Sequence, residues 1–334
     1  MSSILEAMRD VIQADPGQRG LASVPGDNLL TACAGDFANA CASIAKQQAA
    51  SVGVVTGFFI PKGDPPAGET DGPLGALFLA RALTPLGIGV AIATDTYCIT
   101  ALEAGLRACG LAEAVPLIEL PSPSESMSAA EYVESALGEL GQPTHLVALE
   151  RCGPTHTPAT LRSAWSADDT LLEEFRREVP PADRGRCHTM RGIDITLRMR
   201  PAHLLFESRA PDRPVSIGIG DGGNEIGMGR IRWEVIRANI PGGGLVACRT
   251  ATDHLIVCGV SNWGAYALAA GVLHLRRAVP AADLFDVERE RELLRIMVEA
   301  GPLVDGVLGR PAVSVDGLPF ERYAEPFRQL ASLG

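Results

Sequence analysis

Residues 215–230 have the sequence VSIGIGDGGNEIGMGR, in which a short apolar run passes directly into a glycine-rich loop. The run VSIGIG follows Pro214 and has the length and composition of a buried strand. Four glycines between positions 220 and 227 allow the backbone that follows to approach a ligand closely. We therefore expect a strand at 215–220 whose carboxyl end opens onto a binding loop.

Similar apolar runs recur along the chain and alternate with segments of helical spacing. The runs are apolar on both faces, as is typical of parallel strands buried between layers of helices. The alternation predicts a single α/β domain over residues 1–334, with a doubly wound, mostly parallel sheet and helices on both faces. Further strands are expected at 51–60, 87–94, 115–120, 144–150 and 253–260, and helices at 72–83, 99–109, 128–141, 166–179, 264–277 and 284–300.

Composition excludes several classes of protein. The chain has 29 Lys and Arg against 40 Asp and Glu, a net charge of -11, and no basic stripe that would bind nucleic acid. No uninterrupted apolar run is long enough to cross a membrane. The eight cysteines form no C-x-x-C pair and are expected to be reduced. Because the N-terminus also lacks the apolar stretch of a signal peptide, a cytoplasmic protein is expected.

Polar residues follow most of the predicted strands. Because the carboxyl ends of parallel strands meet at one edge of a sheet, these residues are expected to line a common cleft. The expected site residues are Lys62 and Asp71, Asp95, Glu150 and Arg151, Asp221, Asn224 and Glu225, and Asn262 and Trp263.

The chemistry expected at this edge follows from the residue types. Asp221 and Glu225 are candidate ligands for a divalent cation, Mg²⁺ or Mn²⁺, but they equally suit a substrate ammonium group. Together with Glu150 they are also the candidate catalytic residues. No nucleotide-binding fingerprint or P-loop is present, so no organic cofactor is expected.

The remaining candidates are expected to bind substrate. Lys62 and Arg151 suit a substrate carboxylate. Asp71 and Asp95 are also candidate helix N-caps, since each precedes a predicted helix. Asn262 and Trp263 complete this set of expected substrate-binding residues.

Several strings resemble the D-glutamate cyclase C-terminal domain family. They are GFFIPKGDPPAGETDGPLGALFLARAL, the Thr94-Asp95 strand end, Glu150-Arg151, SIGIGDGGNEIGMGR and GVSNWGAYAL, and the resemblance extends from about residue 34 to 307. It implies a lyase that cyclises D-glutamate to 5-oxo-D-proline with loss of water. The implied partner is therefore a small amino-acid substrate, with neither nucleic acid nor membrane involved and a homo-oligomer left open.

Two other functions compete with this hypothesis. One is a non-catalytic domain that binds an amino acid or a nucleotide. The other is a metal-dependent hydrolase of small cyclic amides, which would run the same chemistry in reverse. Residue types alone leave these alternatives open, because all three functions need polar groups at the strand ends.

Overall fold

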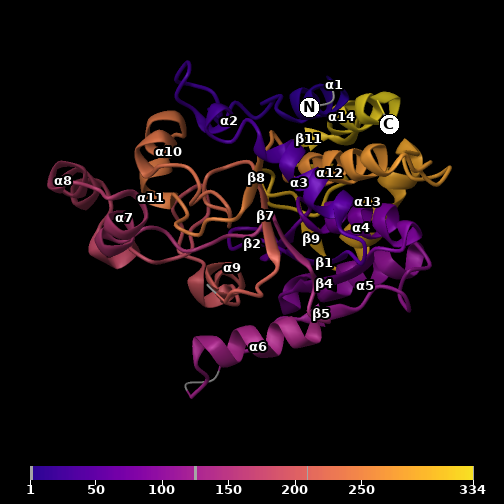
Figure 1. The fold of residues 1–334 in the computed structure, drawn as a ribbon, viewed down its shortest axis with the longest axis horizontal. Helices are drawn as coiled ribbons and strands as arrows, with labels where there is room; N and C mark the ends of the chain where they lie inside the picture. Colours follow the sequence, from indigo (N-terminus) through magenta and orange to yellow (C-terminus); the bar gives the residue numbers. More distant parts are fainter. Residues whose placement is uncertain (1–2, 124–125, 209, 334) are drawn as a thin grey trace.

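The computed structural model describes residues 3–123, 126–208 and 210–333, and its centre is a six-stranded sheet in which all strands are parallel (Figure 1). The spatial order of the strands is β5-β4-β1-β6-β7-β8. All six predicted strands are present, and the predicted α/β class is confirmed. Their bounds are β1 (Ser51–Thr56), β4 (Gly89–Thr94), β5 (Leu117–Glu119), β6 (His145–Leu149), β7 (Val215–Gly220) and β8 (His254–Val257).

The chain reverses direction across the sheet between β1 and β6. It starts at β1, runs outward to β5, and returns to place β6, β7 and β8 on the other side of β1. Register pairs Val52 with His145 and Thr56 with Leu149, so β1 and β6 end at the same level. Such a reversal leaves a crevice at the carboxyl ends of the two central strands, which is where doubly wound sheets bind ligands.

One face of the sheet is covered by a large group of helices, which Figure 1 shows gathered on the side of both termini. Val54, Val147 and Ile217 from the strands pack in the same apolar core as the side chains of these helices. The helices are α1 (Ser3–Ile12), α3 (Asp36–Lys46), α4 (Pro73–Leu83), α5 (Thr96–Ala108), α12 (Ser261–Arg276), α13 (Val287–Ala300) and α14 (Phe320–Leu333).

The other face carries two smaller apolar cores. Val55 and Leu146 pack with α6 (Ala129–Glu139) and α9 (His203–Glu207). Leu255 and Val257 pack in a separate cluster with the remaining helices. These are α2 (Leu29–Ala32), α7 (Pro158–Trp165), α8 (Asp169–Glu178), α10 (Trp233–Asn239) and α11 (Gly243–Val246). Helices thus cover both faces, and none within the described ranges is long and apolar enough to cross a membrane.

Short elements border the carboxyl edge of the main sheet. The strands β2 (Phe59–Ile60), β3 (Ala67–Glu69) and β9 (Leu303–Val304) form a small mixed sheet. The strands β10 (Ser314–Val315) and β11 (Leu318–Pro319) form a hairpin. Single turns of 3-10 helix lie at Thr84–Leu86, Pro181–Asp183 and Thr196–Arg198.

Two local predictions are wrong. The strand expected over 51–60 ends at Thr56, because Gly57 has a φ of 104° and turns the chain out of the main sheet. Ser166 does not begin the helix expected over 166–179. It ends α7 with a left-handed φ of 52°, whereas Asp168 caps α8 by accepting a hydrogen bond from the Leu171 N–H at 2.8 Å.

Candidate active site

A cleft of about 500 Å³ lies at the carboxyl edge of the sheet. Its walls combine apolar side chains, such as Phe58 and Ile193, with charged groups of both signs. The lining therefore combines apolar surface with charges of both signs, as is typical of sites for small polar molecules. The charged lining residues are Arg19, Lys62, Glu69, Glu150, Arg191 and Asp316.

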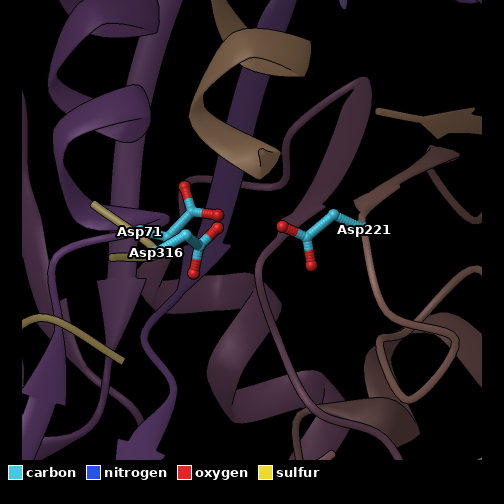
Figure 2. Close-up of side chains that lie close together, drawn as sticks. All are labelled: Asp71, Asp221 and Asp316. Carbon is cyan, nitrogen blue, oxygen red and sulfur yellow. The ribbon is translucent and has the colours of Figure 1, made fainter. Parts of the chain in front are cut away.

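Three aspartates from distant segments converge beside this cleft. Asp71 follows β3, Asp221 follows β7, and Asp316 lies in the turn between β10 and β11. Figure 2 shows the Asp221 carboxylate facing the other two, and an oxygen of each lies within 4.8 Å of the others. The structure therefore brings two predicted site residues together with Asp316, which lies outside the expected set.

Arg19 joins two of these aspartates. Its Nη1 lies 2.7 Å from Asp221 Oδ1, and its Nη2 lies 2.7 Å from Asp316 Oδ2. The second oxygen of Asp221, Oδ2, is buried and receives no hydrogen bond from the described part of the chain. A buried carboxylate oxygen without a donor is costly unless a ligand or a proton satisfies it.

Asp71 and Asn262 cap each other's helices. Asp71 accepts hydrogen bonds from the N–H groups of Ser261 and Asn262 at 2.8 Å each, at the start of α12. Asn262 Oδ1 accepts from the N–H groups of Gly72 and Gly75 at 2.9 and 2.8 Å, at the start of α4. The positive ends of both helix dipoles therefore lie beside the acidic groups and partly offset their charge.

Glu150 occupies the end of β6, beside Asp221. Its φ of 44° is in the left-handed region, which is uncommon for a residue other than glycine and is characteristic of functional sites. The Ser261 hydroxyl donates a 2.5 Å hydrogen bond to Glu150 Oε2. Burial, and then the carboxylate of Glu225, raises the pKa of Glu150 well above its usual range.

The same environment acts on the neighbouring acids. Burial, and then the Asp316 carboxylate, raises the pKa of Asp71 to about 8. Burial also raises the pKa of Asp221 well above its usual range, although Arg19 opposes the shift. For Glu69, burial and then Asp316 raise the pKa well above the ordinary value. Taken together, these acids carry more potential negative charge than Arg19 can neutralise, so the site favours protons or a further cation.

Glu225 holds the glycine-rich loop in shape. Its Oε1 accepts from the N–H groups of Asp221 and Gly222 at 3.0 and 2.6 Å, and its Oε2 accepts from the Gly223 N–H at 2.8 Å. Both oxygens are thus engaged by the backbone that carries Asp221. Asn224 Nδ2 donates to the His188 carbonyl at 2.8 Å, while its Oδ1 is buried and has no donor among the described residues.

Arg151 and Asp95 are turned toward each other. The Arg151 guanidinium forms an ion pair with Asp95 and donates to the carbonyls of Gly57 and Arg200 at 3.0 and 2.9 Å. The Arg151 side chain is fully buried and is not part of the cleft lining. Binding a substrate carboxylate there would require this pair to separate.

Trp263 and Lys62 have contrasting positions. Trp263 is buried in the core, where its Nε1 donates to the Tyr323 carbonyl at 3.0 Å. Lys62 is exposed at the mouth of the cleft and lines it with Arg191. Of this pair, only Lys62 can meet a ligand in the cleft without rearrangement.

Arg19 and Asp316 lie outside the expected set, as do Glu69 and Arg191 of the cleft lining. Asp316 had a detectable signal, because Asp-Gly between two apolar residues is typical of a hairpin turn. Arg19 had no comparable signal, because it stands in a loop between α1 and α2 with no adjacent strand. Both also lie outside the range 34–307 over which the resemblance was expected.

Comparison with known proteins covers both of these positions. The chain matches the family described as D-glutamate cyclase-like, C-terminal, over residues 8–165 and 178–331. It is 29% identical over 360 residues to a human protein named D-glutamate cyclase, mitochondrial. The match includes 99% of this chain and 52% of the human protein, so the chain spans about half the length of that relative.

Proposed function

Because the chain belongs to the D-glutamate cyclase-like C-terminal family, we propose that it cyclises D-glutamate to 5-oxo-D-proline with loss of water. The observation that carries this proposal is the position of Glu150. It is a buried acid with a raised pKa, and it lines the cleft at the reversal point of the sheet. A carboxyl group in such a place can exchange protons with a bound substrate.

The reaction requires two protons to be moved. The amine nitrogen of glutamate forms a bond to the γ-carboxyl carbon, and a bond from that carbon to oxygen breaks. The ammonium loses two protons in total, and both leave with the departing oxygen as water. A single carboxyl group meets this requirement when it carries the two protons in turn, each taken by its ionised form at nitrogen and returned at the departing oxygen, and we assign that role to Glu150.

The remaining lining suits the other parts of glutamate. Lys62 and Arg191 are cations at the mouth that can attract a carboxylate. Phe58 and Ile193 offer an apolar wall to the two methylene groups. Because ring closure is intramolecular, a cleft that holds the chain in a folded conformation contributes substantially to the rate.

The proposal predicts the behaviour of Glu150→Gln. This change keeps the size of the side chain and removes its acid, so turnover of D-glutamate should fall about 10²-fold or more while the fold persists. Glu119→Gln is the matched control, since Glu119 ends β5 at the same edge of the sheet but does not line the cleft. Mass spectrometry measures the product, which is lighter than glutamate by one water.

The outcomes separate this function from its alternatives. Glu150→Gln with wild-type turnover would contradict the assigned role. Wild-type protein that binds D-glutamate in calorimetry but forms no product would be an amino-acid-binding domain. Net opening of cyclic amides would instead favour a hydrolase. The cytoplasmic location expected from the sequence stays a prediction, since the human relative is mitochondrial by name.

A further inference from the structure

We propose that Asp71, Asp221 and Asp316 bind one divalent cation, Mg²⁺ or Mn²⁺. The binding itself does not depend on the reaction proposed above. The role of the ion does depend on that reaction, because we expect the ion to hold the substrate carboxylate that the amine attacks.

The first argument is the convergence of the three carboxylates. They come from three segments of the chain that lie far apart in sequence, yet one oxygen of each lies within 4.8 Å of the others (Figure 2). Like charges at this separation repel strongly when they are buried. An arrangement of this kind is stable when a cation lies between the oxygens.

The second argument is the orphaned oxygen of Asp221. Arg19 engages Oδ1 of this residue, while Oδ2 is buried and has no donor within the described residues. Asp221 is fully buried, and its carboxylate faces Asp71 and Asp316. Carboxylate oxygens with these properties are the ligands that Mg²⁺ and Mn²⁺ prefer.

The third argument is the balance of charge. When ionised, the three aspartates carry three negative charges, and the Arg19 guanidinium supplies one positive charge to Asp221 and Asp316. Two negative charges remain, which one divalent ion neutralises.

The ligand set differs from the one expected from the sequence. Asp221 is common to both sets, whereas Glu225 lies with Glu150 and Asp221 in a second group whose oxygens come within 4.8 Å of one another, and its three backbone hydrogen bonds shape the loop that carries Asp221. Asp71 is held by the first N–H groups of α12, and Asp316 by the hairpin turn that carries it. These supports fix the positions of the ligands before the ion arrives. The adjacent cleft leaves room for the water molecules that Mg²⁺ retains.

Manganese binding to the metal-free chain of 334 residues tests this site without substrate. Electron paramagnetic resonance of free Mn²⁺ should show one ion bound per chain and displacement by Mg²⁺. Asp316→Asn removes one charged ligand and should weaken Mn²⁺ binding about tenfold or more. Asp212→Asn, at an exposed position outside the cleft, is the matched control and should bind as the wild type does.

A second variant keeps the test decisive if Asp316→Asn does not fold. Asp221→Asn removes the charge of the orphaned oxygen and should weaken binding by a similar factor. Circular dichroism verifies that each variant is folded. The proposal is overturned if wild-type protein leaves the Mn²⁺ signal unchanged, or if the folded variants bind Mn²⁺ as tightly as the wild type.

Failure of this site and failure of the proposed function give different results. D-glutamate turnover in chelator-treated protein that binds no Mn²⁺ would reject the metal and retain the cyclisation. Stoichiometric Mn²⁺ binding without turnover in any metal would retain the site and reject the cyclisation.

Discussion

Replacing Arg151 by methionine tests whether this residue stabilises the fold or binds substrate. The guanidinium lies in the protein interior, where it pairs with Asp95 and donates to the carbonyls of Gly57 and Arg200. Methionine fills much of the same volume but offers no donor. The substitution therefore leaves the Asp95 carboxylate buried without its cation, although the Arg200 N–H still donates to it at 2.8 Å.

The expected loss follows from the burial of this pair. Removing one member of a buried ion pair costs about 3–5 kcal/mol, because the other charge remains desolvated. The entropy of unfolding for a chain of 334 residues is about 0.7 kcal/mol/K, if the transition is cooperative. Arg151→Met should therefore lower Tm by about 4–7 °C.

Differential scanning calorimetry measures this change, and two further variants control it. Arg162→Met breaks an exposed pair with Asp169 and should cost about 0.5 kcal/mol or less. Arg151→Met combined with Asp95→Asn should cost less than the sum of the single changes, because no buried charge is left unpaired. An unchanged Tm together with a raised KM for D-glutamate would refute the reasoning and restore Arg151 as a substrate ligand.

Two further predictions concern stability. Burial lowers the pKa of His145 and His156 to about 4 from an ordinary 6.5, so both favour the neutral form when folded. The contribution of these histidines to the free energy of unfolding should be fully present above pH 6.5 and should be lost toward pH 4, by about 1–2 kcal/mol for each histidine. In urea titrations, His145→Leu should make this loss smaller. Gly218→Ala places a Cβ 2.7 Å from the Gly227 Cα and should cost about 1–3 kcal/mol by thermal melting. Gly89→Ala, whose nearest neighbour is 3.6 Å away, should cost less; equal losses would contradict this packing argument.

Much of the fold was predictable because its signals are local. Each of the six strands is a short apolar run bounded by loop residues, and the alternation with helices dictates a parallel sheet. The errors occurred where two signals compete. The run of apolar residues over 51–60 continues through Gly57, although the backbone conformation of Gly57 ends the strand. Ser166 and Asp168 are both common helix caps, and only the three-dimensional structure distinguishes them.

The site was predictable to the level of strand ends and no further. Glu150 and Asp221 come together because β6 and β7 are neighbours in the sheet and both end at the cleft. Arg151 and Asp95 also follow strands, but they neutralise each other instead of facing a ligand. Residue type and position thus predict which charged residues lie at the carboxyl edge of the sheet. They do not predict which of these residues form ion pairs, because pairing depends on the directions of the side chains.

The sequence does not predict which residues contact the acidic loop, although it does predict that the loop binds a cation. From Asp221 and Glu225 the sequence predicted an ammonium group or a divalent cation as the guest of this loop. Arg19 supplies part of that charge from a loop 202 positions earlier in the chain, and Asp316 adds further negative charge from a distant hairpin. Arg19, a residue of the protein itself, therefore supplies part of the positive charge that was expected from a bound cation. The charge that Arg19 leaves uncompensated is the reason to look for a divalent ion, and the orphaned Asp221 oxygen is the place to look for it.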